Sequence, residues 1–180
     1  MSNLKKGNQG FTLIEIIVGI VISAVSLTML YSLIYPQIVR SVEPMLQIRA
    51  AELGQAIVEE ILAKPYDEQS PTGGVPPCNP CTAAAGFGSD SGEATRAEFD
   101  DVDDFDTYCG SPQAIDQILG VAPSGFDNYR MESCVIYDGN YDGAADNDQS
   151  AKRITVSVYA PTRGGGFAPP IRFSAYRGNF

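Results

Sequence analysis

Residues 10–15 read GFTLIE and open an apolar segment that continues to Tyr35. Between Phe11 and Tyr35 the only charged side chain is Glu15. A carboxylate near the start of a long apolar segment is energetically costly, so it is normally retained for a function. The segment therefore determines where the chain resides and how its N-terminal part folds.

The apolar segment from Phe11 to Tyr35 is long enough to cross a bilayer, whose hydrocarbon core takes about 20 residues of α-helix. A helix is the only single segment that satisfies its own backbone hydrogen bonds in lipid. Lys5 and Lys6 precede it and predict a cytoplasmic N-terminus. A secretory signal fits less well, because its apolar core spans about 7–15 residues and its cleavage site follows that core.

The leader ends in Gly10, Phe11 comes next, and Glu15 occupies the fifth position after the glycine. This pattern resembles the type III signal of type IV prepilins and pseudopilins. The resemblance implies that a prepilin peptidase removes residues 1–10 and that Phe11 becomes an N-methylated first residue. It also implies that Glu15 pairs with the free amine of a neighbouring subunit. The alternative is a plain membrane anchor, which leaves Glu15 unexplained.

Helical periodicity continues beyond the apolar segment. The apolar positions recur every three or four residues and are Val42, Leu46, Ala50, Leu53, Ile57 and Ile61. We expect one helix from about Phe11 to about Ala63, with bends or unwound turns near Pro36 and Pro44, which lack a backbone donor. Residues 11–35 would lie in lipid or in a filament core. Residues 36–64, an amphipathic continuation with one apolar stripe, would pack on a soluble head.

Residues 65–180 are predicted to form this globular head. Prolines and glycines break any regular period between Tyr66 and Asp106, which predicts loops, and a short helix is expected near Gln113–Leu119. Apolar and polar side chains then alternate over residues 129–137, 153–160 and 171–177, as in half-buried antiparallel strands. Since the helical stripe is the available cover for these strands, we predict an α+β fold with the helix laid on a small antiparallel sheet. The resemblance implies the same pilin fold.

Composition narrows the possible functions. The 180 residues carry a net charge of −10 and no histidine. Nucleic-acid binding is excluded because it needs basic patches. Catalysis by serine or cysteine lacks its histidine base, and the glycines at 164–166 are interpreted as a turn. We predict a protein that is not an enzyme and requires no cofactor. The acidic stretches at 90–106 and 138–148 are interpreted as solvated loops.

The four cysteines, Cys78, Cys81, Cys109 and Cys134, all follow the apolar segment. Outside the inner membrane they would be in an oxidising compartment and paired. Four cysteines allow three pairings, of which Cys78–Cys81 with Cys109–Cys134 is favoured over the crossed alternatives. The motif CNPC at 78–81 follows no strand, which argues against a redox centre. A zinc site would need a second tight pair or histidines.

A second candidate site lies in the acidic loop that follows residue 137. Asp138, Asn140 and Asp142 repeat the opening of an EF-hand-like calcium loop, and Asp146 falls at its ninth position. Gln149 at the twelfth position cannot supply the usual bidentate carboxylate, and strands rather than helices flank the loop. Two interpretations remain open, a Ca²⁺ site formed by these side chains and a plain polar hairpin connection.

Stretches of the helix and the head resemble minor pilins of the mannose-sensitive haemagglutinin (MSHA) pilus. They are residues 41–44, 49–55, 60–64, 99–104 and 173–180. The resemblance implies a protein that waits in the inner membrane with a periplasmic C-terminal part. It would then join other major and minor pilins through its helix, at the cell surface, acting in initiation or at the tip. The alternatives are a type II secretion pseudopilin and a membrane-anchored calcium-dependent adhesin or binding module.

Overall fold

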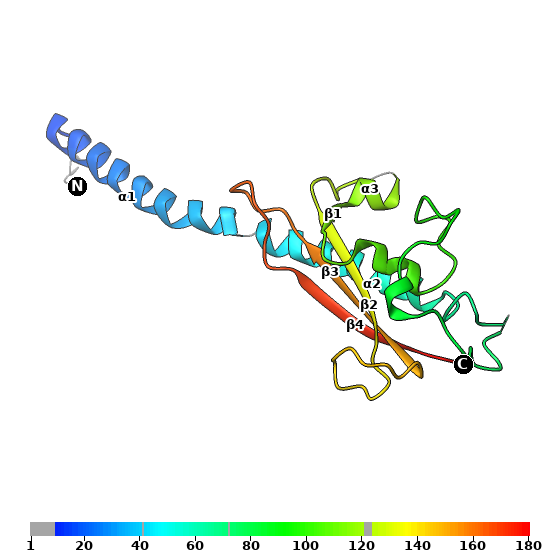
Figure 1. The fold of residues 1–180 in the computed structure, drawn as a ribbon. Coiled ribbons are helices and arrows are strands. Elements are labelled where there is room, and N and C mark those ends of the chain that lie inside the picture. Colours follow the sequence, from blue (N-terminus) through cyan, green and yellow to red (C-terminus); the bar gives the residue numbers. More distant parts are fainter. Residues whose placement is uncertain (1–9, 41, 72, 121–123) are drawn as a thin grey trace, which may run out of the picture. The chain divides into compact units, whose positions relative to one another are not determined.

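The structure is a computed structural model that describes residues 10–40, 42–71, 73–120 and 124–180. Two compact units follow one another along the chain, residues 1–43 and Pro44–Phe180. Helix α1 (Leu13–Arg40) belongs to the first, and the second, the C-terminal unit, holds the sheet and nearly all of helix α2 (Val42–Leu62) (Figure 1). Each unit is described by itself. Most of the predicted leader, including Lys5 and Lys6, lies outside the described residues.

Helix α1 has the properties of a membrane span. Its 23 residues Leu13–Tyr35 are long and apolar enough to cross a membrane, and all of their side chains are exposed. At about 1.5 Å per residue they extend roughly 35 Å, against about 30 Å for a hydrocarbon core. The hydroxyls of its serines and of Thr28 donate 2.8 Å hydrogen bonds to carbonyls of the same helix. These hydroxyls are therefore satisfied without water.

The sheet of the C-terminal unit is an antiparallel meander in the order β1-β2-β3-β4. Its strands are β1 (Gln113–Ala114), β2 (Arg130–Tyr137), β3 (Ala151–Tyr159) and β4 (Ile171–Gly178). Helix α3 (Ile115–Leu119) and the short 3₁₀ helices η1 (Ala84–Gly86) and η2 (Asp103–Tyr108) lie in the connections. Val135 is opposite Ile154, which is opposite Ala175. Because side chains alternate along a strand, these three apolar residues share one face of the sheet.

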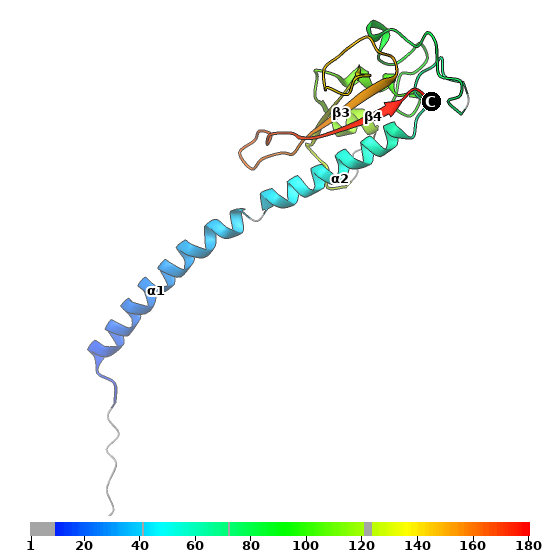
Figure 2. The ribbon, with the colours of Figure 1, turned by 90° about the horizontal axis from the view of Figure 1, so that it is seen from below.

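Helix α2 covers this apolar face. The buried residues of its stripe and of the two central strands form one core, made of Ala50, Leu53, Ile57, Ile61, Met131, Val135, Ile154, Val156 and Val158. Figure 2 shows α2 running along the sheet beside β3 and β4. Pro44 lies in the first turn of α2, where a proline is tolerated because no intrahelical donor is needed there. The unit is thus a helical layer on an antiparallel sheet.

Helix η2 covers the edge of β2 that the short strand β1 leaves free. The backbone N–H of Val135 donates to Oδ1 of Asp106 at 2.8 Å. The Cys109–Cys134 disulfide, whose Cα atoms are 4.6 Å apart, joins the residue after η2 to β2. Burial raises the pKa of Asp106, while the Val135 hydrogen bond opposes that rise. A covered edge cannot pair with a further strand.

The structure confirms the predicted α+β fold, and β2, β3 and β4 fall on the three alternating segments. The single helix expected from about Phe11 to about Ala63 is described as α1 and α2, and Ser41 between them lies outside the described residues. The interpretation of the first acidic stretch as solvated holds for Asp90, Glu98 and Asp100, which are exposed. It was wrong for Asp101, Asp103 and Asp104, which are buried. The reason is that the carboxylates of Asp101 and Asp104 accept backbone N–H groups of their own turn.

Gly54 allows α2 to approach the sheet closely. A Cβ at this position would lie 2.6 Å from the Phe173 ring and 3.2 Å from Cγ2 of Val158. We expect Gly54→Ala to lower the thermal midpoint of unfolding, because overpacking of about 1–3 kcal/mol outweighs a helix-propensity gain of roughly 1 kcal/mol. Gln47→Ala, at an exposed position of the same helix, is the matched control. A higher midpoint for Gly54→Ala would show that the ring moves aside freely.

Candidate functional site

The predicted processing site lies immediately before the first helix. Gly10 and Phe11 are exposed and precede the first residue of α1. The Thr12 carbonyl accepts the N–H groups of Glu15 and Ile16 at 3.1 and 3.3 Å, so the helical hydrogen bonds begin there. The bond between Gly10 and Phe11 is therefore outside the helix, where a peptidase can bind an extended backbone.

Glu15 projects from the first turn of α1, among exposed apolar side chains. A carboxylate is favourable at this end of a helix because the free N–H groups there carry partial positive charge. In the part of the chain that the structure describes, the hydrogen bonds and ion pairs do not include the Glu15 carboxylate. In an apolar environment such a charge would be costly unless a cation approached it.

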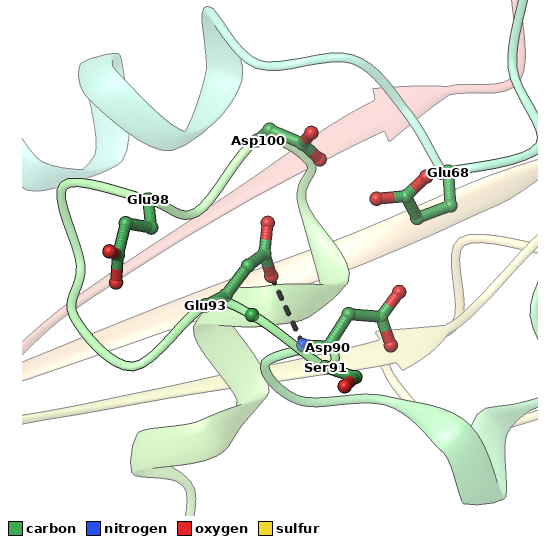
Figure 3. Close-up of a pocket in the computed structure, with 7 residues that line it drawn as sticks. Glu68, Asp90, Ser91, Glu93, Glu98 and Asp100 are labelled. Carbon is green, nitrogen blue, oxygen red and sulfur yellow. Dashed lines mark hydrogen bonds between the residues drawn. The ribbon is translucent and has the colours of Figure 1, made fainter.

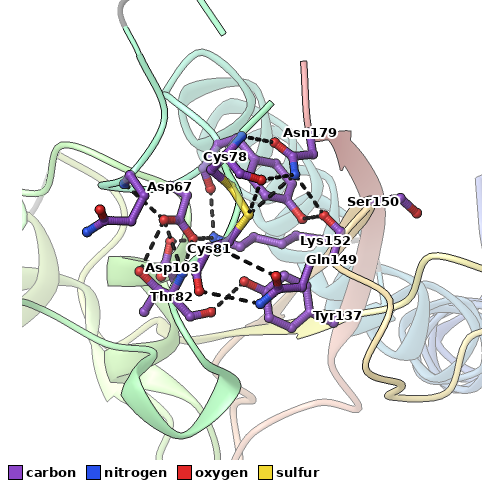
Figure 4. Close-up of a disulfide and its surroundings, with 12 residues drawn as sticks. Asp67, Cys78, Cys81, Thr82, Asp103, Tyr137, Gln149, Ser150, Lys152 and Asn179 are labelled. Atoms are coloured by element: carbon purple, nitrogen blue, oxygen red, sulfur yellow. Dashed lines mark hydrogen bonds and ion pairs between the residues drawn. A yellow bond between two sulfur atoms is a disulfide. The ribbon is translucent and has the colours of Figure 1, made fainter. Parts of the chain in front are cut away.

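The Cys78–Cys81 disulfide loop of the C-terminal unit is anchored by side-chain amides (Figure 4). Cys78 and Cys81 form one disulfide, and both residues are buried. The Cys78 N–H donates to Oδ1 of Asn179 at 3.0 Å, and Nδ2 of Asn179 donates back to the Cys78 carbonyl at 3.2 Å. Gln149 exchanges two 3.4 Å hydrogen bonds with the Cys81 backbone. The disulfide loop thereby holds the residue after β4 and the residues just before β3 in place. The two disulfides of the structure, Cys78–Cys81 and Cys109–Cys134, are the pairs favoured from the sequence.

A buried lysine lies next to this disulfide loop, and sequence reasoning missed it. Nζ of Lys152 is 2.6 Å from Oδ1 of Asp103, 3.0 Å from Oδ2 of Asp67 and 2.7 Å from the Tyr66 carbonyl. Lys152 has no exposed surface. The signal was present in the sequence, because residue 152 is in phase with Ile154 on the core face of β3.

Aromatic rings complete the walls around this amine. Nζ of Lys152 lies 4.5 Å from the ring centroid of Tyr66, 5.0 Å from that of Phe87 and 5.6 Å from that of Tyr137. Burial raises the pKa of the Tyr66 hydroxyl most, and the charges of Tyr137 and Asp67 add to the rise. Burial also raises the pKa of Tyr137, and the carboxylates of Asp67 and Asp103 add to it. The amine is thus enclosed by aromatic faces, and the carboxylates of Asp67 and Asp103 are its ion-pair partners.

A third carboxyl group borders the same cluster. Burial raises the pKa of Asp101 to about 9, and its hydrogen bond with Asp103 and the negative charges of Asp103 and Asp104 add to the rise. Asp101 is therefore protonated at neutral pH. The cluster then holds one ammonium and the two carboxylates of Asp67 and Asp103.

We expect Asp101 to make the stability of the C-terminal unit dependent on pH. A carboxyl whose folded pKa is raised from 3.8 to about 9 favours folding below 3.8 and loses that contribution as the pH rises through about 9. We expect Asp101→Asn to flatten this decline, because an amide stays neutral and still accepts the turn N–H groups. Thermal unfolding followed across this pH range checks it, with the exposed Asp127→Asn as control. Identical pH profiles for Asp101→Asn and the wild type would contradict the assignment.

An open acidic depression of about 600 Å³ lies on another part of the C-terminal unit (Figure 3). Its charged lining consists of Glu68, Asp90, Glu93, Glu98 and Asp100. The charge of Asp100 is the main cause that raises the pKa of Glu68, whereas burial is the main cause for Glu93. Oxygens of Glu68, Glu93 and Asp100 lie within 4.8 Å of one another, close enough to share a cation. The raised pKa of Glu68 indicates that its carboxylate and that of Asp100 repel one another.

Hydrogen bonds between its acidic side chains and its own backbone N–H groups hold the predicted calcium loop together. The Asp138 carboxylate is buried and accepts the Tyr176 hydroxyl at 2.6 Å and the N–H groups of Asp142 and Gly143 at 3.1 and 2.9 Å. Burial raises the pKa of Asp138, but these hydrogen bonds outweigh it and lower the pKa below its ordinary value. Asp146 accepts the Gly139 N–H at 3.3 Å.

The four proposed calcium ligands share this loop, but the structure does not gather the three carboxylates among them. Among the described residues, Asp138, Asp142 and Asp146 do not form a group with oxygens within 4.8 Å of one another. Asn140 donates to Asp142 at 3.1 Å, and Gln149 at the twelfth position binds the disulfide loop.

Calcium binding stays a prediction. We expect it to be no tighter than the about 10⁻⁴–10⁻³ M of extracellular modules, because the loop lacks its twelfth-position carboxylate. Calorimetric titration of the full chain with calcium chloride checks this, with Asp142→Ala as the variant that should lose any heat. Absence of heat at millimolar calcium would remove the site.

Comparison with known proteins adds one finding. Residues 5–31 match the family model of the prokaryotic N-terminal methylation motif. This match includes Gly10, Phe11 and Glu15 and most of the predicted span. No curated protein and no solved structure matched the chain. The apolar helix and the motif fit anchoring in a membrane before assembly. The chain therefore carries the N-terminal signal of type IV pilin-like proteins, which implies processing by a prepilin peptidase and pilin assembly.

Proposed function

We propose that the protein is a minor pilin of an MSHA-type pilus, of the kind represented by the MSHA biogenesis protein MshD. The observation that carries the proposal is the methylation motif joined to an exposed apolar helix whose span contains one carboxylate, Glu15. Resemblances in the second half of the helix and in the head support the MSHA-type assignment. The role is structural, since the motif is that of subunits that act by assembly.

Assembly would follow from the chemistry of the N-terminal segment. Before processing, the chain lies in the inner membrane with its basic leader in the cytoplasm and its C-terminal unit in the periplasm. Cleavage after Gly10 frees the amine of Phe11. In the fibre this positive terminus pairs with Glu15 of a neighbouring subunit, which removes the cost of an isolated buried charge. The exposed apolar surface of α1 then packs against the helices of other pilins.

The C-terminal unit would lie at or near the fibre tip and help to initiate polymerisation or present a surface. Its construction supports a role outside the inner membrane, because two disulfides fasten its loops and disulfides persist in oxidising compartments. Its acidic depression is available at the surface for contacts with other subunits.

Fractionation of cells tests the proposal. Pili are sheared from the surface and purified, and the chain is detected in them with an antibody. We expect the processed wild-type chain in the pilus fraction, and we expect Gly10→Val, which blocks the cleavage site, to be retained in the inner membrane. A chain found only with a type II secretion complex would favour the pseudopilin alternative. An uncleaved chain that stays in the membrane would favour an anchored binding module and would overturn the proposal.

A further inference from the structure

We propose that Lys152 and Asp103 are joined by an intramolecular amide bond, formed between Nζ of the lysine and Cγ of the aspartate in the core of the C-terminal unit. The inference rests on the placement of an amine, an acceptor carboxyl and a second carboxylate within hydrogen-bond distance in a site closed to water (Figure 4). It is independent of the role in a fibre.

The amine is placed for attack and shielded from solvent. Nζ of Lys152 is 2.6 Å from Oδ1 of Asp103, with three aromatic rings around it and no exposed surface on the lysine. Transfer of one proton from the ammonium to a carboxylate neutralises two desolvated charges at once, and burial favours the neutral forms. Two groups fixed in contact also react with a large effective concentration.

The two carboxylates differ in their surroundings, and the difference assigns their roles. The Asp67 carboxylate accepts the Thr82 N–H at 2.9 Å, the Thr82 hydroxyl at 3.1 Å and the Gln69 N–H at 3.0 Å. These donors stabilise its charged form, which suits a base. Among the described residues, the Asp103 carboxylate makes hydrogen bonds only with Lys152 and with the neighbouring Asp101 carboxyl. Asp103 is therefore the acceptor.

The reaction balances without an oxidant or a metal. One proton of the ammonium first passes to the Asp103 carboxylate, which frees the Nζ lone pair. The lone pair attacks Cγ of Asp103, so that an N–C bond forms and one C–O bond breaks. Asp67, whose Oδ2 lies 3.0 Å from Nζ, takes a second proton from the nitrogen and delivers it to the departing oxygen, which already carries the first. That oxygen leaves as water, and a neutral secondary amide remains. The Asp101 carboxyl, next to Asp103, polarises the acceptor by donating its proton in a hydrogen bond.

The amide bond would add a covalent cross-link to the C-terminal unit, in addition to its two disulfides. It would link η2, at Asp103, to the start of β3, at Lys152. Unlike the two disulfides, an amide resists reduction. A subunit held in a fibre under tension would gain a connection that does not depend on the redox state.

Intact mass spectrometry of the full chain tests the bond. The chain is purified from its oxidising compartment, fully reduced and denatured, and the mass is compared with that of the linear sequence after the same N-terminal processing. We expect a deficit of one water. Digestion with chymotrypsin, which cuts at several aromatic residues between the two positions, should yield a branched peptide containing Asp103 and Lys152.

Variants separate the bond from the ion pair. Lys152→Arg keeps the positive charge but should show the full linear mass, and Asp67→Asn should leave a linear fraction because its base is removed. Lys64→Arg, a lysine that donates to the Phe99 carbonyl instead, is the matched control and should keep the deficit. A wild-type mass equal to that of the linear chain overturns the proposal, whatever the variants do.

Discussion

Glu15→Val is expected to leave the protein in the inner membrane and to remove most of it from purified fibres. The substitution makes the span Leu13–Tyr35 more apolar, so insertion should be unimpaired. In the fibre, however, the freed amine of a neighbouring Phe11 would then lie in an apolar bundle without a carboxylate. An uncompensated buried charge costs about 3–5 kcal/mol, which corresponds to a loss of incorporation of more than about 100-fold.

The measurement compares the amount of chain in the membrane with the amount in sheared pili. Glu43→Gln is the matched control, since it removes an exposed acid outside the span. It should be incorporated like the wild type. Equal incorporation of Glu15→Val would mean that the carboxylate has no part in assembly and that the apolar surface of α1 suffices.

The second large effect is expected at the buried cluster. Lys152→Met keeps the volume of the side chain but leaves Asp67 and Asp103 buried without a cation, which should destabilise the C-terminal unit by about 3–5 kcal/mol. Thermal unfolding of the purified chain measures this. The exposed Arg172→Met is the control and should change little. Loss of an amide at the same position would act in the same direction.

A double variant separates the charge from the shape of the side chain. Lys152→Met combined with Asp103→Leu removes the cation and one of the two acids, so it should recover part of the lost stability. If Lys152→Met unfolded at the temperature of the wild type, the cluster would contribute nothing to the fold and its ion pairs would be incidental.

The fold was predictable because it depends on periodicity. The apolar run whose only charged residue is Glu15 predicted α1, and the stripe through Ala50, Leu53 and Ile57 predicted the face of α2 that covers the sheet. Strict alternation gave β2, β3 and β4, which pair with their neighbours in the chain. Each of these signals is local, since it needs only the spacing of apolar residues within one segment.

The buried cluster was not predictable in the same way, because its members are distant in the chain. Lys152 lies 85 residues from Asp67 and 49 residues from Asp103. Loop composition suggested that the acids near Asp103 were solvated, and only the fold brings them to the amine. The phase of residue 152 on the core face of β3 was the one local sign of a buried lysine, and it did not identify the partners.

Mass spectrometry of the N-terminus of the chain recovered from purified pili reports cleavage, methylation and incorporation together. We expect a mature chain that starts at Phe11 and carries a methyl group on its amine. A chain that keeps its leader, or that is never found in a polymer, would contradict the proposed function.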